Sequence, residues 1–240
     1  TIWNLQIMIK NKNILIIGGS SGIGLALADL LSSSNNIYIA SRSSDNLAGL
    51  NARHINFDAT SESLDTSLLP EKLDGFVYCP GSINLRPFKG LSVEAFEKDF
   101  QINVTGAINS LKNVLGNLGA SGNASIVFFS TVAVQTGMPF HSSVAASKGA
   151  IEGLTRSLAA EFAPKIRVNA IAPSLVNTPL ASKFLNNDTK LEKANERHPL
   201  GRIGSAKEIA QAAAFLLGEE SSWMTGRVLQ LDGGIGNLKT

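Results

Sequence analysis

The chain has 240 residues, a length that fits one large domain better than two. Hydrophobic residues make up 44% of it and charged residues 17%, which is typical of a packed globular protein and excludes a disordered chain. Its 21 Lys and Arg against 19 Asp and Glu leave a net charge of +2. That charge is too small to hold nucleic acid or an anionic membrane through a broad positive field, so we predict neither as a partner.

Cysteine content and apolar stretches restrict the class of protein further. Cys79 is the single cysteine, which excludes an internal disulfide framework and a cysteine-based zinc site, and we predict no metal. Residues 1–9 show neither the basic leader nor the small-residue cleavage pattern of a targeting signal. No apolar run approaches the roughly 18–20 residues of a spanning helix. We therefore expect a cytoplasmic protein.

Short apolar runs alternate with longer helical patterns along the chain. The predicted strands cover residues 13–17, 37–40, 55–57, 75–79, 125–129, 166–171 and 228–231. The predicted helices cover residues 22–31, 92–115, 142–162 and 205–217. This alternation predicts an α/β fold with a doubly wound parallel sheet of about seven strands and helices on both faces. Residues 179–204 are the least regular stretch, and we predict a substrate-binding loop there.

A glycine-rich turn, GGSSGIG, follows the first predicted strand and opens the first predicted helix. Glycines at 18, 22 and 24 allow positive φ and a close approach of phosphate to the backbone, which a tight turn alone does not require. The helix N-terminus adds free N–H groups and partial positive charge for a pyrophosphate. The residues that we predict to bind the cofactor here are Gly18, Ser20, Ser21, Gly22, Ile23 and Gly24.

The G-x-x-x-G-x-G spacing of this turn resembles that of the short-chain dehydrogenase/reductase family. Further matching motifs follow in order, among them Asn103-Val104-x-Gly106, Arg167-Val168-Asn169, Pro199-Leu200-Gly201-Arg202 and Asp232-Gly233-Gly234. The resemblance implies one Rossmann-like domain over residues 1–240 and an oxidoreductase with a nicotinamide cofactor and a small-molecule substrate. It also implies a homodimer or homotetramer, paired through helices 92–115 and 142–162.

The residues that end the second predicted strand indicate which cofactor binds. An acidic residue there would bond the adenine ribose 2′-OH and repel a 2′-phosphate. Ser41 occupies the position, and Arg42 and Ser43 follow it. A small neutral residue before an arginine leaves room and a cation for a phosphate, which favours NADP(H) over NAD(H). Alternatively, Arg42 is a solvated surface charge.

The family resemblance assigns further cofactor contacts. They are Asp58, Ala59, Gly81, Lys148, Pro173, Val176 and Thr178. Asp58 would contact the adenine amino group, or else cap a helix. The last three residues belong to the segment after the sixth predicted strand, which would face the carboxamide of the nicotinamide.

At the catalytic positions the chain departs from the family pattern of Asn, Ser, Tyr and Lys. Asn103 and Lys148 match the asparagine and the lysine, and Thr131 keeps a hydroxyl at the serine position. Four residues before Lys148, where the family has its tyrosine, stands Val144. Hydride transfer to a carbonyl creates an alkoxide that must gain a proton, which the family's tyrosine would donate and valine cannot. A general acid of this kind contributes about 10²–10⁴-fold to the rate.

Two functional hypotheses follow from this departure. In the first, the protein reduces a carbonyl or an enone, and conjugate addition to an enone gives an enolate that is less basic than an alkoxide. His141, seven residues before Lys148, would then act as acid or oxyanion donor, or else be a histidine at the rim of the cleft. In the second, the protein binds NADP(H) without turnover, as a regulator or subunit.

Overall fold

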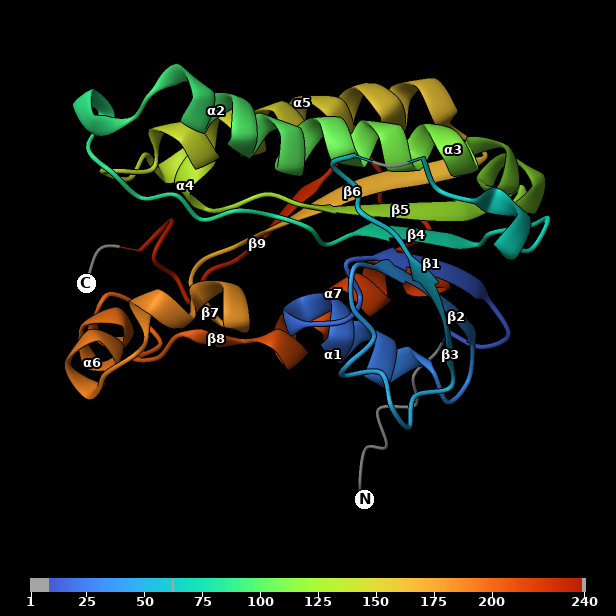
Figure 1. Ribbon diagram of the computed structural model, residues 1–240, viewed down its shortest axis with the longest axis horizontal. Helices are drawn as coiled ribbons and strands as arrows, with labels where there is room; N and C mark the ends of the chain where they lie inside the picture. Colours follow the sequence, from blue (N-terminus) through green and yellow to red (C-terminus); the bar gives the residue numbers. More distant parts are fainter. Residues whose placement is uncertain (1–8, 62, 239–240) are drawn as a thin grey trace.

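The computed structural model describes residues 9–61 and 63–238. Within them, seven parallel strands form one sheet (Figure 1). In spatial order they are β3 (Ala52–Asn56), β2 (Asn36–Ser41), β1 (Asn13–Ile17), β4 (Gly75–Tyr78), β5 (Ala124–Phe129), β6 (Ile166–Pro173) and β9 (Val228–Leu231). The predicted α/β fold and its doubly wound sheet are confirmed. Residues 1–8, on which the expectation about a targeting signal depends, lie outside the described part.

Helices cover both faces of this sheet (Figure 1). One face carries α1 (Gly22–Leu31) and α7 (Ala206–Leu217), and the other carries α2 (Val93–Phe100), α3 (Gly106–Ser121) and α5 (Ser142–Phe162). Alternate residues of each strand enter one of two cores, so that Leu15 and Phe128 pack on one side and Ile16 and Val127 on the other. Burial on both faces explains why the strands read as continuous apolar runs. No described helix is long and apolar enough to cross a membrane.

The order of the strands reverses beside β1. Ile14 of β1 pairs with Ile37 of β2 on one side and with Gly75 of β4 on the other. The chain thus builds the sheet outward in two directions from β1. In open α/β sheets such a switch point leaves a crevice at the carboxyl ends of the strands, where ligands bind.

The prediction of one α-helix over residues 92–115 is wrong, because a π-helical segment, η3 (Gln101–Thr105), separates α2 from α3. The Tyr78 hydroxyl of β4 donates a hydrogen bond of 2.7 Å to the Ile102 carbonyl. The Gly106 N–H bonds to the Gln101 carbonyl, five residues back, instead. A Cβ at Gly106 would overlap the Tyr78 hydroxyl. The tyrosine therefore occupies the Ile102 carbonyl, which the Gly106 N–H would bond in a regular α-helix. The backbone hydrogen bonds of the helix shift by one residue as a result.

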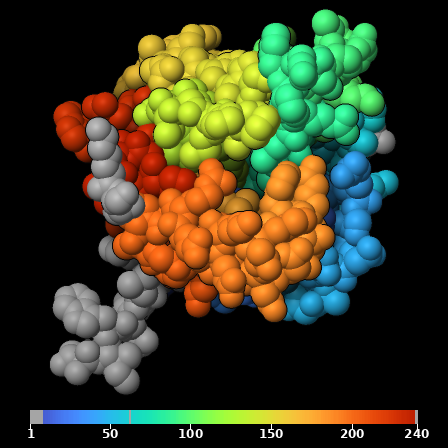
Figure 2. Space-filling model, turned by 90° about the vertical axis from the view of Figure 1, so that its left-hand side faces the viewer, coloured from blue at the N-terminus to red at the C-terminus, as the bar shows by residue number. Residues whose placement is uncertain are grey.

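Residues 179–204 are more regular than their sequence pattern indicates, while their predicted role in binding substrate stays a prediction. The segment contains a 3-10 helix, η4 (Pro179–Phe184), and α6 (Asp188–Glu196), and it lies between β7 (Val176–Asn177) and its partner β8 (Gly204–Ser205). The Asn187 side chain caps α6 by accepting the Lys190 N–H, and Ala194 and His198 are buried beneath it. Figure 2 shows the segment in orange beside a hollow, opposite residues near 135 in yellow-green.

Shorter elements complete the described chain, and sequence patterns did not predict them. They are α4 (Ala133–Thr136) and the 3-10 turns η1 (Thr66–Leu68), η2 (Phe88–Gly90) and η5 (Glu219–Ser221). The third predicted strand, 55–57, begins too late, because residues from Ala52 onward already pair with β2.

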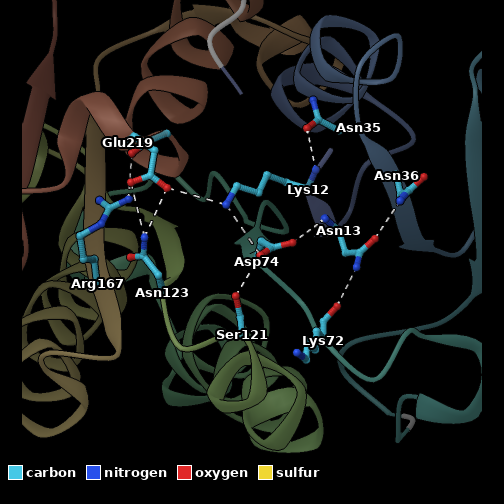
Figure 3. A network of polar contacts seen from close by, with 11 residues as sticks. Lys12, Asn13, Asn35, Asn36, Lys72, Asp74, Ser121, Asn123, Arg167 and Glu219 are labelled. Carbon is cyan, nitrogen blue, oxygen red and sulfur yellow. Dashed lines mark hydrogen bonds and ion pairs between the residues drawn. The ribbon is translucent and has the colours of Figure 1, made fainter. Parts of the chain in front are cut away.

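A polar network joins the amino ends of the strands, at the sheet edge away from the switch-point crevice (Figure 3). Asp74, just before β4, accepts the Asn13 N–H at 2.9 Å and the Ser121 hydroxyl at 2.9 Å. Lys12 approaches Asp74 and Glu219 at 3.9 and 3.7 Å. The Asp74 carboxylate thus links the first residue of β1, Asn13, to the last residue of α3, Ser121.

Replacing Asp74 with alanine should lower the free energy of unfolding by about 1–3 kcal/mol, because the Asn13 N–H and the Ser121 hydroxyl lose their acceptor. Lys12→Ala is the control, since partly exposed ion pairs contribute at most about 1 kcal/mol. Urea unfolding followed by circular dichroism measures both variants. If the two variants lost the same free energy of unfolding, the assigned role of Asp74 would be contradicted.

Candidate functional site

The glycine turn lies between β1 and α1, as predicted, and leaves a cradle at the start of the helix. Gly18 has φ +74° and Gly22 has φ +54°. A Cβ at Gly24 would lie 2.5 Å from the Gly18 carbonyl oxygen, so only glycine lets the helix approach the strand this closely. Ser21 makes no side-chain cap, and the first turn of α1 has no acidic residue. The turn therefore fits a phosphate group bound by backbone N–H donors.

The loop after β2 lies beside this turn. The Asn46 amide donates to the Ser20 carbonyl at 3.1 Å and ties the loop to the glycine turn. Arg42 and Ser43 are exposed on this loop. The buried Ser41 hydroxyl donates to the Ser43 carbonyl at 2.8 Å, so its proton is used within the loop. Of the three residues predicted to select the cofactor, Arg42 thus presents a charge at the surface beside the turn.

Asp58 caps the turn after β3 and not a helix. Its carboxylate accepts the Thr60 N–H at 2.9 Å and the Thr60 hydroxyl at 2.7 Å. These two bonds, with a smaller contribution from the Arg42 charge, hold the pKa of Asp58 below its usual value. Ala59 is buried, and its carbonyl lies close to Gly106 of α3.

A cavity of about 490 Å³ opens beyond the carboxyl ends of β4, β5 and β6. The structure brings eight of the predicted site residues together in its wall: Ile23, Gly81, Thr131, His141, Lys148, Pro173, Val176 and Thr178. Val144, one turn before Lys148 on α5, lines the cavity as well and is buried. Segments η4 and α6 close its outer side.

Asn103 lies behind the cavity wall rather than in it. It is fully buried, and its amide donates to the Ser147 hydroxyl at 2.9 Å and to the Ser82 hydroxyl at 3.0 Å. Ser82 in turn donates to the buried carboxylate of Asp99 at 2.6 Å, and Ser143 donates to the other oxygen of that carboxylate. Sequence patterns did not identify four residues of this network: Ser82, Asp99, Ser143 and Ser147. A single acidic residue within a helical pattern gives no sign that it is buried.

Lys148 is buried, and its ammonium lies close to Gly81. A Cβ at Gly81 would lie 3.4 Å from the Lys148 Nζ and 3.4 Å from the Asn103 Oδ1, so glycine leaves room for both groups. Burial lowers the pKa of Lys148 to about 8, against the smaller opposing effects of Cys79 and Asp99. Burial also raises the pKa of the Cys79 thiol to about 12. Lys148 can therefore release a proton near neutral pH, and Cys79 stays a thiol.

Thr131 and His141 present different hydrogen-bonding groups to the cavity. The Thr131 Oγ1 accepts the Ala133 N–H at 3.3 Å, and no described residue takes its proton. The His141 Nδ1 lies 2.7 Å from the Pro139 carbonyl, which can only accept, so Nδ1 carries the proton of the neutral ring. Only the cationic ring would then have a proton on Nε2.

Two further buried polar residues stand beside the cavity, and sequence patterns did not identify them. His198 donates from Nδ1 to the Ala194 carbonyl at 2.7 Å, and its Nε2 lies 2.9 Å from the Ser174 hydroxyl, which anchors α6 to the end of β6. Glu152, one turn after Lys148, accepts the Ser130 hydroxyl at 2.8 Å. Glu152 follows Lys148 by four residues, and this spacing could have indicated that it lies on the buried face of α5. No described group of three or more His, Cys, Asp or Glu is arranged to hold a metal.

Comparison with known proteins finds similar sequences over nearly the whole chain. The family model described as "Enoyl-(Acyl carrier protein) reductase" matches residues 18–236. A 2,5-dichloro-2,5-cyclohexadiene-1,4-diol dehydrogenase of Sphingobium indicum is 34% identical over 94% of this chain and 97% of its own. A tropinone reductase homolog of Arabidopsis thaliana is 33% identical over 97% of this chain and 94% of its own.

The fold of solved structures matches as well. An actinorhodin polyketide ketoreductase variant, solved with NADPH, superposes with a TM-score of 0.88 at 26% identity, over 95% of this chain and 98% of its own. The named relatives are dehydrogenases and reductases, and the family binds nicotinamide cofactors. The chain belongs to the short-chain dehydrogenase/reductase family of oxidoreductases.

Proposed function

We propose that this protein is an NADP(H)-dependent oxidoreductase that transfers a hydride to or from a small carbonyl or enone substrate at an atypical active site. One observation carries the proposal: a single cavity joins Ile23 of the glycine turn, and Gly81 after β4, to the polar groups of Thr131 and Lys148. A cofactor bound along the carboxyl edge of the sheet and a substrate in the cavity would therefore meet at Lys148.

The cofactor supplies the hydride when it is bound. The backbone of the glycine turn would hold its pyrophosphate, and Asp58 and Ala59 would lie beside its adenine. Arg42 and Ser43 would bind a 2′-phosphate, since Arg42 is exposed beside the turn and no acidic residue follows β2 before Asp45. Pro173, Val176 and Thr178 would face the nicotinamide, and Lys148 its ribose. The structure of a related ketoreductase with NADPH supports this choice of cofactor.

The protein's own residues would orient the substrate and provide the proton. The Thr131 hydroxyl would donate a hydrogen bond to the substrate oxygen. The Lys148 ammonium would donate the proton that the oxygen needs, since Val144 has none and the lowered pKa of Lys148 makes it a competent acid. Asn103 would position both walls of the cavity through Ser82 and Ser147. His141 would take part only in its cationic form, because its neutral ring keeps the proton on Nδ1.

A second candidate function is binding of NADP(H) without turnover, as a regulator or subunit. The valine side chain in the cavity wall favours it, because an alkoxide there would lack its usual donor. We further propose that two or four copies associate through α3 and α5, where Gly116, Gly119 and Gly153 leave open surface. A cytoplasmic location remains part of the proposal.

Arg42→Asp should weaken NADPH binding roughly 10–100-fold, because a carboxylate would replace the cation at the 2′-phosphate. NADH binding should change less than about threefold, since NADH lacks that phosphate. Fluorescence titration with the two cofactors measures both affinities. Lys89→Asp, an exposed change of equal charge on η2, is the control. Equal weakening of NADPH and NADH by Arg42→Asp would show that Arg42 does not select the cofactor.

The value of kcat/KM for reduction should fall as the pH rises through about 8, because Lys148 donates only while it is protonated. In Lys148→Arg the fall should move to higher pH, since the guanidinium stays charged. NADPH affinity, followed over the same pH range, separates cofactor binding from proton transfer. A wild-type profile that is flat from about pH 7 to pH 9 would rule out Lys148 as the acid.

Val144→Tyr should raise ketone reduction, by as much as about 10²–10⁴-fold, because it restores a phenol one turn from Lys148. Val144→Phe is the matched control, with the same ring and no proton. NADPH absorbance with a panel of ketones and α,β-unsaturated ketones gives the rates. Wild-type turnover of enones alone supports a reductase, and tight NADPH binding with no turnover supports the second function. Equal rates in the two variants would contradict the predicted position of the phenol.

A further inference from the structure

The charged lining of the cavity is all of one sign. Among the described residues that line it, none is Asp or Glu. The basic ones include Lys148 at the inner end. The others, which we call the cationic face, come from η4, from α6 and from the residue after it, and they are Lys183, Lys190, Lys193 and Arg197.

Helix α6 separates its charges by face. Its basic residues, at 190 and 193, together with Arg197 after its last turn, recur at intervals of three and four and border the cavity. Its acidic residues, Asp188, Glu192 and Glu196, recur every four residues and do not line the cavity. With about 100° per residue, these two series lie on different sides of the helix. The buried residues Ala194 and His198 fix how α6 lies against the protein and so turn the basic side toward the opening.

The cationic face has no charged partner in the described structure. The four ion pairs found there include none of its members. Lys183 donates to the Ile83 carbonyl at 2.8 Å, and Lys190 donates to the Asn186 side-chain oxygen at 2.8 Å, so their acceptors are neutral. No described carboxylate therefore lies within ion-pairing distance of these cations, and they present positive charge to the cavity mouth. Figure 2 shows this segment, in orange, along one side of the hollow.

The inner wall of the cavity, by contrast, is largely apolar, with Phe129, Val132, Val144 and Val176 around Thr131 and Lys148. We propose that the substrate is a small organic anion, whose carboxylate or phosphate binds the cationic face while its apolar body brings the reacting carbon to Thr131 and Lys148. This inference rests on the proposed function of the same cavity. All four members of the cationic face line the cavity, whereas Arg42 and the glycine turn, apart from Ile23, do not.

The test compares carboxylates with their uncharged methyl esters. The probes are 4-oxopentanoate and 3-oxocyclohexanecarboxylate and the two esters, titrated by calorimetry into protein saturated with NADP⁺, which cannot reduce them. Wild-type protein should bind at least one acid about tenfold or more tightly than its ester, since charge-assisted hydrogen bonds strengthen only the anion. That preference should shrink as the salt concentration rises.

The double variant Lys193→Gln/Arg197→Gln should abolish the preference and leave the affinity for the ester unchanged. The matched control, Glu192→Gln/Glu196→Gln, removes two charges from the outer side of α6 and should retain the preference. Wild-type protein that binds both acids no better than their esters would overturn the inference. So would a control variant that loses as much of the preference for the acid as the Lys193→Gln/Arg197→Gln variant does. If NADP⁺ does not bind, the proposed function fails, and the same titrations on the cofactor-free protein still decide this inference.

Discussion

Parallel pairing of the seven strands forces all of their carboxyl ends onto one edge of the sheet. Because β1 pairs with both β2 and β4, the chain turns away from β1 in two directions, and the glycine turn stands at that point. Residues that are distant in the sequence, from Ile23 to His198, meet at this edge for the same reason. The opposite edge holds the polar network around Asp74, so stability and ligand binding occupy different ends of the same strands.

One hydrogen bond shapes the wall of the site from a distance. The Tyr78 hydroxyl occupies the Ile102 carbonyl and thereby creates the π-helical segment that contains Asn103. That segment turns the Asn103 amide toward Ser82 and Ser147. Such segments within helices are frequent at functional sites, since they redirect a side chain without ending the helix. Burial raises the pKa of Tyr78 to a value above its usual range, so the phenol keeps the proton that this bond requires.

The electrostatics of the cavity follow from burial and from the uneven charge of its lining. Burial of Lys148 disfavours its ammonium form and lowers its pKa. The cationic face adds further positive charge at the mouth. A bound anion would reduce the repulsion among these positive charges, and it would also favour the protonated form of Lys148. The proposed substrate class and the proposed proton source therefore support each other.

Local patterns in the sequence determined the strands, most of the helices and the position of the glycine turn, because apolar periodicity and glycine placement are properties of neighbouring residues. The family resemblance pointed to Thr131, Lys148 and Val144 as residues of one site, and the structure places all three around a single cavity. Only the tertiary structure decided features that depend on contacts between distant residues. Tyr78 and Gly106 interrupt a helix that periodicity predicts as continuous, Asp99 is buried beside Ser82, and the order within residues 179–204 depends on burial of Ala194 and His198. Each of these features arises where a side chain contacts a residue of another element, and a local sequence pattern does not predict such a contact.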